Sequence, residues 1–533
     1  MEGPADGPAA GSITRHDGQR TLSIDGRSLR IADIVRVADD VVAVELGADA
    51  RARMAITRDV VDRAVKAAVP VYGINTGFGK LSEVTIPPEQ LDVLQRNLVR
   101  SHAAGVGDPL PERETRAMML LRANVLATAY AGARPLLVEA LLDMLNAGVW
   151  PVVPEQGSVG ASGDLAPLAH LALALIGEGD VNFRGERSDA RTVLAKAGLR
   201  PVELQAKEGL ALINGTQAHT AIAALACAEL SSLWRIAHVA TAMSLEALLG
   251  TPDAFDDRIQ TARGQHGQTA SASLLRFLTH RSAIRESHRT GDARVQDAYA
   301  LRCAPQVHGP ALDALRHARG VIERELNAAT DNPLVLATGE LLSGGNFHGL
   351  AVGMASDILC LVCANLAVIS ERRTDRLVHP DFNQGLPPFL AGFPGLESGF
   401  MMAQVTAAAL ASECKTLAYP ASVDSIPTDG NKEDVVPMAM AAAVKLRRSV
   451  RNLRHVLAIE LIAAAQGLEF RRPLTSSAPV EHAVRVVREF VPAFDGDRAP
   501  APDIARLAVA ITAGAFDVVT ATAVADIAGD LLT

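Results

Sequence analysis

The sequence predicts a mainly α-helical protein, in which a bundle of long helices follows a smaller N-terminal region of mixed structure. The first reason is composition: aromatic residues make up only 4% of the chain, whereas alanine and leucine abound, and this balance favours helices over sheets. The second reason is a series of apolar stretches of about 20 to 30 residues in the C-terminal part, which lack heptad charge patterns and are typical of a helical bundle.

The overall composition is that of a globular protein. The 533 residues include 51 basic and 60 acidic side chains, a formal net charge of −9, and 49% hydrophobic residues. These values exclude a disordered, collagen-like or disulfide-stapled chain, and the net acidity disfavours nucleic acid as a partner. Five cysteines, an odd number, indicate reduced thiols in a cytoplasmic protein.

The N-terminal region begins with a predicted flexible tail over residues 1–20, which is rich in Gly, Pro and Ala and lacks the parts of a signal peptide. Apolar and polar residues alternate over Thr21–Ile31 around Asp25-Gly26, which predicts a β-hairpin. Met118–Ala147 has the composition of a helix. Glu155–Gly163 is dense in Gly and Ser, which predicts an irregular loop with close backbone approach.

Long helices are predicted from Thr216 onward. The first is predicted to end at Gly250 and Pro252. The others are predicted near residues 313–329, 350–372, 398–418 and 433–467. We therefore divide the chain into a domain over 21–215 and a helical region over 216–533. The stretch Leu350–Ser370 contains Asp357 and leaves too short an uncharged run for a membrane span of about 20 residues, so we predict a buried core helix and no membrane partner.

The most informative segment is Gly157–Gly179. It lacks the Gly-x-x-x-x-Gly-Lys-Ser/Thr pattern of a phosphate loop, and Asp164 stands where a nucleophile elbow built on Ser162 needs glycine. One interpretation is a tight turn that opens a helix at Asp164, with Pro167 in the first helical turn. This structural role does not account for so many glycine and serine residues.

A second interpretation is that Ala161, Ser162 and Gly163 form an electrophile. The amide nitrogen of Gly163 attacks the carbonyl carbon of Ala161 and closes a five-membered ring, and glycine suits this attack because it has no Cβ to crowd the nitrogen. Loss of water, including the Ser162 hydroxyl, then leaves an exocyclic alkene conjugated to the ring. The tripeptide alone leaves both interpretations open.

The segment Gly157–Leu168 resembles the signature of the aromatic amino acid ammonia-lyases, which make a methylidene-imidazolone (MIO) group from Ala-Ser-Gly. The resemblance extends from about Leu22 to the end of the chain, and its motifs occur in the family's order. These motifs are YGINTGFG (Tyr72–Gly79), LINGTQ (Leu212–Gln217), QDAYALR (Gln296–Arg302), TDNPL (Thr330–Leu334), GNFH (Gly345–His348) and SVDSIPT (Ser422–Thr428).

The resemblance implies an ammonia-lyase or fumarase–aspartase-like fold and an MIO cofactor formed autocatalytically from residues 161–163. It also implies a homotetramer with active sites shared between chains. Eliminating ammonia requires an electrophile, a base and electrostatic support. The base is implied to be Tyr72, whose pKa must then lie well below its usual value of about 10. Arg302 is implied to hold the substrate carboxylate with a planar fork.

The remaining site residues are carried over from the same motifs. Asn214, Gln296 and Tyr299 match residues that position the substrate and the MIO group, and Phe347 matches an aromatic wall of the pocket. We find no motif for a pyridoxal-bearing lysine, no His-Glu-x-x-His and no paired cysteine ligands. We interpret Cys360-x-x-Cys363 as buried thiols, and we predict no metal or nucleotide.

Two positions bear on the substrate. Ser101-His102 resembles the Ser-His pair of histidine ammonia-lyases, and Glu433 matches a glutamate of these enzymes that orients the ring or handles protons. A histidine and a carboxylate can hydrogen-bond an imidazole, which an apolar pocket leaves unsatisfied. The resemblance therefore implies elimination of ammonia from L-histidine, a reaction of histidine catabolism that gives urocanate.

Three features depart from that pattern: Lys432 in place of glutamine, the sequence GLAVG after His348, and Val435-Val436. They leave open an MIO-dependent lyase or 2,3-aminomutase that acts on tyrosine, phenylalanine or another aromatic amino acid. An inactive helical scaffold is the alternative from a different class of protein.

Overall fold

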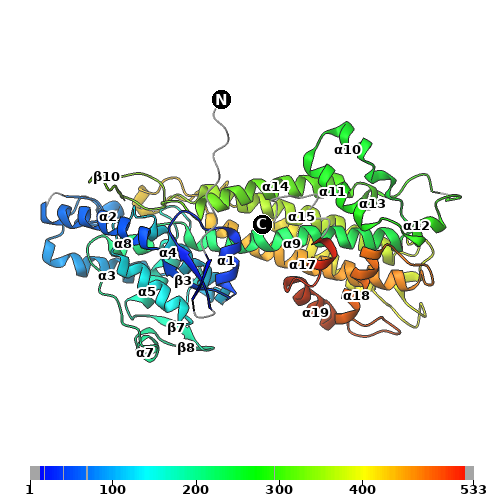
Figure 1. Ribbon diagram of the computed structural model, residues 1–533, viewed down its shortest axis with the longest axis horizontal. Helices are drawn as coiled ribbons and strands as arrows, with labels where there is room; N and C mark the ends of the chain where they lie inside the picture. The colour runs from blue at the N-terminus through cyan, green and yellow to red at the C-terminus, as the bar shows by residue number, and fades with distance from the viewer. Residues whose placement is uncertain (1–12, 17–18, 40, 68–69, 293, 522–533) are drawn as a thin grey trace. The chain divides into compact units, whose positions relative to one another are not determined.

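The computed structural model describes residues 13–16, 19–39, 41–67, 70–292 and 294–521, and these residues are mainly helical (Figure 1). The α-helices are α1 (Ile31–Ala38), α2 (Ala48–Ala67), α3 (Leu91–His102), α4 (Glu112–Ala127), α5 (Pro135–Asn146), α6 (Leu165–Leu175), α7 (Ala190–Lys196), α8 (Glu208–Ile213), α9 (Gln217–Ala247), α10 (Asp257–Arg263), α11 (His266–Leu278), α12 (Ala283–Ser287), α13 (Tyr299–Arg302), α14 (Ala304–Glu325), α15 (Leu350–Val378), α16 (Met401–Leu417), α17 (Ala439–Glu469), α18 (Ala478–Phe490) and α19 (Ala501–Thr512).

The strands are short and lie in small separate sheets. They are β1 (Ile13–His16), β2 (Gln19–Ile24), β3 (Ala43–Leu46), β4 (Val106–Pro109), β5 (Val149–Pro151), β6 (Pro154–Gln156), β7 (Asp180–Phe183), β8 (Glu186–Asp189), β9 (Leu334–Val335) and β10 (Leu341–Leu342). Their orders are β1-β2-β3, β5-β7-β8, β4-β6 and β10-β9. The 3₁₀ helices are η1 (Gly79–Leu81), η2 (Pro88–Gln90), η3 (Pro252–Phe255), η4 (Pro388–Leu390) and η5 (Asp429–Asn431).

The chain forms two compact units that are not consecutive segments. The first unit contains residues 1–225, 319–357 and 420–444, and the second contains 226–318, 358–419 and 445–533. This grouping differs from our division at residue 215, because two later segments return to the N-terminal part. Contacts within the first unit explain this return: the Lys207 ammonium pairs with Asp331 at 2.8 Å, and Gln217 donates to the Thr330 hydroxyl at 2.7 Å.

The predicted hairpin over Thr21–Ile31 is wrong. Residues 19–24 form β2, which pairs with β1 in antiparallel and with β3 in parallel orientation, but no strand directly follows Asp25-Gly26, because the next element is α1. The Asp25 carboxylate instead accepts hydrogen bonds from the backbone amides of Arg27 and Ser28. This local turn leads the chain into α1 rather than back along β2. Most of the predicted tail lies outside the described residues.

The helical prediction over Met118–Ala147 holds for two helices, α4 and α5, rather than for one. The break between them contains Ala129 and Gly132, which both have positive φ, and α5 begins at Pro135. Every residue from Glu114 to Ala127 of α4 is buried. A helix that is enclosed on all sides is a core helix, and α4 packs against α1 and α5 in the first unit.

The second unit is built on long helices, and a pair of oppositely charged side chains is buried between them. Arg373 of α15 pairs with Glu460 of α17 at 2.6 Å, and both side chains are fully buried. The hydroxyls of Ser244 on α9 and Ser370 on α15 donate to the same carboxylate at 2.7 and 2.6 Å. The Arg373 guanidinium and the two hydroxyls donate to the buried Glu460 carboxylate, which would be costly to bury without these partners. This arrangement confirms the predicted bundle of long helices.

Two helices of the described residues, Gln217–Ala247 and Leu350–Val378, are long and apolar enough to cross a membrane. However, 78% and 67% of their most apolar windows are buried within the protein. They are consistent with core helices of a soluble protein, as predicted for the second of them. Cys360 and Cys363 of α15 are buried and do not form a disulfide, also as predicted.

Candidate active site

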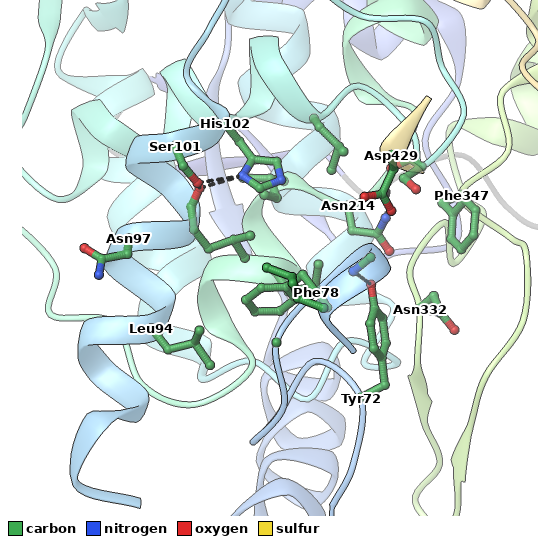
Figure 2. A pocket seen from close by; sticks show the side chains of 18 of the residues that line it. Tyr72, Phe78, Leu94, Asn97, Ser101, His102, Asn214, Asn332, Phe347 and Asp429 are labelled. Atoms are coloured by element: carbon green, nitrogen blue, oxygen red, sulfur yellow. Dashed lines mark hydrogen bonds between the residues drawn. The ribbon is translucent and has the colours of Figure 1, made fainter. Parts of the chain in front are cut away.

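The first unit contains a cavity of about 600 Å³ that collects residues from separate motifs (Figure 2). Tyr72, His102, Ser162, Asn214, Phe347 and Glu433 all line it. An adjoining cavity of about 440 Å³ shares Tyr72, Ser162, Phe347 and Glu433 and adds Ala161, His348 and Lys432. Ser162 therefore lies on the wall of both cavities.

The loop that carries Ala161, Ser162 and Gly163 connects β6 to α6 and depends on a close approach of two backbones. Gly163 has φ +75°, and a Cβ added there would lie 2.2 Å from the carbonyl oxygen of Gly215. Only glycine accommodates both the left-handed conformation and this contact. The next amide, that of Asp164, donates to the Gly215 carbonyl at 2.7 Å. The loop is thus held against the residues that precede α9.

Ser162 is held on both its backbone and its side chain. The Asn214 amide donates to the Ser162 carbonyl oxygen at 2.8 Å, while the other polar atom of that amide, Oδ1, is buried without a partner among the described residues. The Ser162 hydroxyl donates to Glu433, and the second oxygen of Glu433 accepts from Thr428. Thr428 and Glu433 also form an antiparallel bridge. These contacts fix the tripeptide from two sides.

A buried ion pair supports the loop from behind. Asp164 and His219 are fully buried, with 2.8 Å between the carboxylate and Nδ1, and Asp164 also accepts from the His219 amide and the Ser158 hydroxyl. Burial by itself would raise the pKa of Asp164, but the charge and hydrogen bonds of His219 outweigh it and hold this pKa below its ordinary value. Asp164 therefore remains ionised and keeps the start of α6 in place.

Arg122 of α4 supports Asn214. The fully buried guanidinium donates to the carbonyl oxygens of Asn214 at 3.1 Å and of Leu212 at 3.5 Å, at the C-terminal end of α8. Burial lowers the pKa of Arg122 to about 10, and the nearby carboxylates of Asp331 and Asp164 oppose this effect. A cation at this position also interacts favourably with the negative end of the helix.

The Tyr72 hydroxyl accepts a hydrogen bond from the Gly79 amide at 3.4 Å, and its ring lies edge-on to Phe78. We expected a lowered pKa for this tyrosine, but the structure gives the opposite direction. Burial raises the pKa of Tyr72, the Gly79 hydrogen bond lowers it, and the negative charges of Asp429, Glu433 and Asp331 raise it further. For Tyr72 to act as the base implied by the resemblance, a nearby positive charge must lower its pKa.

His102 is the last residue of α3, and its ring orientation is set by the backbone (Figure 2). Nδ1 lies 2.8 Å from the Leu98 carbonyl oxygen and 3.1 Å from the Ser101 hydroxyl oxygen. Because a carbonyl can only accept, Nδ1 carries the proton, and Nε2 of the neutral ring is left as an acceptor. The side chain therefore offers an acceptor to whatever occupies the cavity.

Three polar residues of the cavity, Asn97, Asn332 and Asp429, were not singled out by the sequence reasoning. Asn332 and Asp429 both line it, and the Asp429 carboxylate packs against Gly79 and accepts from the Lys80 amide at 3.4 Å. Both residues lie within or beside motifs that were recognised, TDNPL and SVDSIPT. Lys432 lines the adjoining cavity and is exposed.

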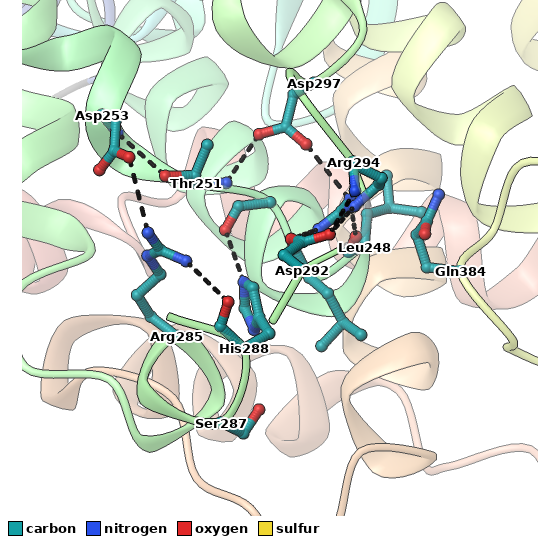
Figure 3. A network of polar contacts seen from close by, with 12 residues as sticks. Leu248, Thr251, Asp253, Arg285, Ser287, His288, Asp292, Arg294, Asp297 and Gln384 are labelled. Atoms are coloured by element: carbon teal, nitrogen blue, oxygen red, sulfur yellow. Dashed lines mark hydrogen bonds and ion pairs between the residues drawn. The ribbon is translucent and has the colours of Figure 1, made fainter. Parts of the chain in front are cut away.

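The other three predicted residues, Gln296, Tyr299 and Arg302, belong to the second unit and do not line the cavity. The Arg302 guanidinium lies 4.6 Å from the centre of the Tyr299 ring. Its Nε is buried without a partner among the described residues, and Tyr299 is 70% exposed. A network of charged residues surrounds the preceding segment (Figure 3). Within the described residues, no group of three or more His, Cys, Asp or Glu side chains could hold a metal ion.

Known proteins are similar to this chain over nearly its whole length. Residues 29–489 match the family described as "Aromatic amino acid lyase". The histidine ammonia-lyase of Stigmatella aurantiaca is 51% identical over 494 residues, which are 92% of this chain and 96% of that protein.

Two solved structures have similar folds. The crystal structure of histidine ammonia-lyase from Trypanosoma cruzi has a TM-score of 0.89 and 41% identity, and the match covers 96% of this chain and 98% of that one. Tyrosine aminomutase from Streptomyces globisporus also has a TM-score of 0.89, with 36% identity over 94% of this chain and 98% of that one.

Proposed function

Because the chain belongs to the aromatic amino acid lyase family, we propose that it eliminates ammonia from L-histidine to give urocanate. The predicted family, fold and carbon–nitrogen lyase class are confirmed by these similarities. The observation that carries the histidine proposal is His102, whose Nε2 is left as an acceptor by the hydrogen bond from Nδ1 to Leu98. An imidazole N–H of the substrate satisfies that acceptor, whereas a phenyl ring does not.

The residues around Ser162 fit an MIO group. Gly163 has a left-handed conformation and lies against the backbone of Gly215, where a side chain would not fit, and Asn214 holds the Ser162 carbonyl oxygen. The buried Oδ1 of Asn214 has no partner among the described residues and offers an acceptor at the same place. When formed from Ala161, Ser162 and Gly163, the group supplies an electrophile that turns the substrate amine into a better leaving group.

The chain's own residues supply the remaining chemistry. Tyr72 takes the proton from the β-carbon, the electron pair forms the double bond between the α- and β-carbons, and the bond to the amine breaks. His102 orients the imidazole, and Phe347 forms a wall of the same cavity. Glu433 is the fixed carboxylate beside Ser162 and either orients the ring or handles protons.

We place Gln296, Tyr299 and Arg302 at the substrate carboxylate and the MIO group. The unpartnered Nε of Arg302 and its stacking on Tyr299 support this assignment, because a guanidinium fork suits a carboxylate. We propose that these residues come from another copy of the chain in a cytoplasmic homotetramer.

A 2,3-aminomutase acting on tyrosine is the second candidate, favoured by the structural similarity to tyrosine aminomutase and by Val435 on the wall of the adjoining cavity. The higher identity to the histidine ammonia-lyase of Stigmatella aurantiaca supports the lyase instead.

The test is to supply the purified protein separately with histidine, tyrosine and phenylalanine, and to follow released ammonia and the ultraviolet absorbance of the conjugated acid. The proposal expects both signals with histidine. Signals only with another amino acid, or a β-amino acid product without ammonia, would contradict it. The variant Ser162→Ala serves as the control: it should stay folded and lose nearly all turnover. In the wild type, the peptide spanning residues 161–163 should be lighter by two waters.

A further inference from the structure

The segment Gln296–Arg302 carries three residues assigned above to the substrate and the MIO group and is anchored by others, among them Ala300, whose carbonyl oxygen accepts from Arg373 at 3.5 Å. Gln296 and Tyr299 are exposed and Arg302 is partly exposed, whereas Asp297 and Leu301 are 7% and 2% exposed. The segment begins without regular structure, and α13 contains only four residues. A helix of one turn is not stable by itself. The position of Arg302 therefore depends on what holds Asp297 and Leu301.

Asp297 is held by the backbone of Thr251 and by Arg294 (Figure 3). One carboxylate oxygen accepts from the Thr251 amide at 2.7 Å, and the other accepts from Arg294 Nη1 at 3.2 Å. Val295, which lies between Arg294 and Gln296, is 96% exposed and gives the segment no apolar anchor. The polar contacts of Asp297 are thus the attachment nearest to Gln296.

Arg294 in turn is fixed to the end of α9. Its guanidinium donates to the carbonyl oxygens of Leu248 at 3.2 Å and of Leu249, which follow the last residue of the helix. These carbonyls belong to the helix end where a cation is stabilising. The Asp292 carboxylate accepts hydrogen bonds from the other side of the Arg294 guanidinium, from Nη2 at 2.8 Å and from Nε at 3.1 Å.

A second arginine adds to the same helix end. Arg471 Nε donates to the Ala247 carbonyl at 2.8 Å and Nη2 donates to Gln384 at 2.9 Å. Burial first, and then the positive charge of Arg294, lower the pKa of Arg471 to about 10. Two cations are therefore held close together, and Asp292 and Asp297 supply the negative charge on the side of Arg294.

From this arrangement we propose that Arg294 is a positioning residue for substrate binding: through Asp297 it fixes the segment that carries Gln296 and Arg302 to the rigid end of α9. The inference rests on the proposed role of Arg302 at the substrate carboxylate. It assigns to Arg294 no contact with the substrate.

The test compares steady-state kinetics on histidine for Arg294→Met, Arg294→Lys and the wild type. A misplaced Arg302 weakens binding of the carboxylate in the ground state and the transition state alike, so KM rises while kcat changes little. We expect KM to rise roughly ten-fold or more in Arg294→Met, because displacements of about 1 Å are costly. Arg294→Lys should recover part of this loss, since it keeps the charge but not the fork.

The matched control is Arg289→Met, which removes an exposed arginine paired with Glu286 in the same unit. Its KM should equal that of the wild type. An unchanged KM in Arg294→Met overturns the inference. So does a fall in kcat at constant KM, which would indicate only a smaller folded fraction, and so does an equal rise in the control.

Two further variants separate the inference from the function on which it rests. Asp297→Asn keeps an acceptor for the Thr251 amide but removes the charge that faces Arg294, and it carries the test if Arg294→Met does not fold. A rise in KM is again expected, and an unchanged KM refutes the positioning role. Arg302→Met tests the proposed function: if its KM is unchanged, the assignment of Arg302 fails. If only Arg302→Met raises KM, the role of Arg294 fails alone.

Discussion

Replacement of His102 by leucine tests how the substrate is selected. The structure allows the effect to be attributed to the substrate, because the helix end remains satisfied in the variant. The Leu98 carbonyl loses Nδ1 of His102 but keeps the Ser101 hydroxyl, which donates to it at 3.1 Å. The main loss is therefore the acceptor that Nε2 offers to an imidazole N–H.

The magnitude follows from leaving that N–H unpaired. Leu94, Leu98 and Val84 line the same cavity and cannot replace the acceptor. An unsatisfied buried donor costs about 1–3 kcal/mol, which at about 1.36 kcal/mol per factor of ten corresponds to a roughly 5- to 160-fold lower kcat/KM for histidine. A phenyl ring has no such donor, so kcat/KM for phenylalanine should stay equal or rise.

The assay measures kcat/KM for histidine and for phenylalanine in His102→Leu and in a control, Ser101→Ala. The control removes one contact of Nδ1 but leaves Leu98 to orient the ring, so its preference for histidine should be that of the wild type. An unchanged ratio of the two constants in His102→Leu would show that His102 does not select the substrate. A fall by the same factor for both substrates would mean damage to the cavity instead.

Three further outcomes are expected. Asp429→Asn removes a charge that raises the pKa of Tyr72; because the base acts deprotonated, the acid limb of kcat/KM should move to lower pH, and a shift to higher pH would contradict this. The acid limb of kcat should lie at lower pH than that of kcat/KM, since the substrate's ammonium favours deprotonated Tyr72 in the complex. Asp164→Asn breaks a buried ion pair and should lower the free energy of unfolding by about 3–5 kcal/mol at neutral pH. The folded-state pKa of Asp164 is lowered, so the stabilisation by its carboxylate is complete above the unfolded-state pKa of about 4 and is lost as the pH falls through the folded-state pKa. Denaturant titrations of the wild type at neutral pH and at acidic pH measure this loss.

Local signals in the sequence predict the long helices well. The first was predicted from residue 216 to its stop at Gly250 and Pro252, and α9 spans Gln217–Ala247. The hairpin prediction failed because the pairing of β2 depends on a strand that is distant in the sequence. β2 pairs in parallel with β3, and no feature of Thr21–Ile31 itself announces that pairing.

The candidate site likewise combines residues that the sequence predicts with residues that only the structure reveals. Motifs far apart in the chain supplied Tyr72, His102 and Asn214, and the structure collects them around one cavity. The signature Gly157–Leu168 includes Asp164, but the motifs gave no indication of Arg122 or of His219 as the buried partner of Asp164. A charged residue in a helix pattern normally lies at the surface, so only tertiary structure reveals that these charges are buried beneath the loop.

The raised pKa of Tyr72 links the proposed base to the charge of the proposed substrate. Burial first, and then the charges of Asp429, Glu433 and Asp331, disfavour a tyrosinate. Asp429 and Glu433, which line the cavity, also attract the α-ammonium of an incoming substrate. Once bound, that positive charge offsets theirs and favours the deprotonated tyrosine. On the proposed role of Tyr72 as the base, the charges of Asp429 and Glu433 that disfavour its deprotonation therefore also attract the cation that favours it. We infer that proton abstraction is coupled to binding of a cationic amine, so that a ligand that lacks the ammonium group leaves Tyr72 protonated.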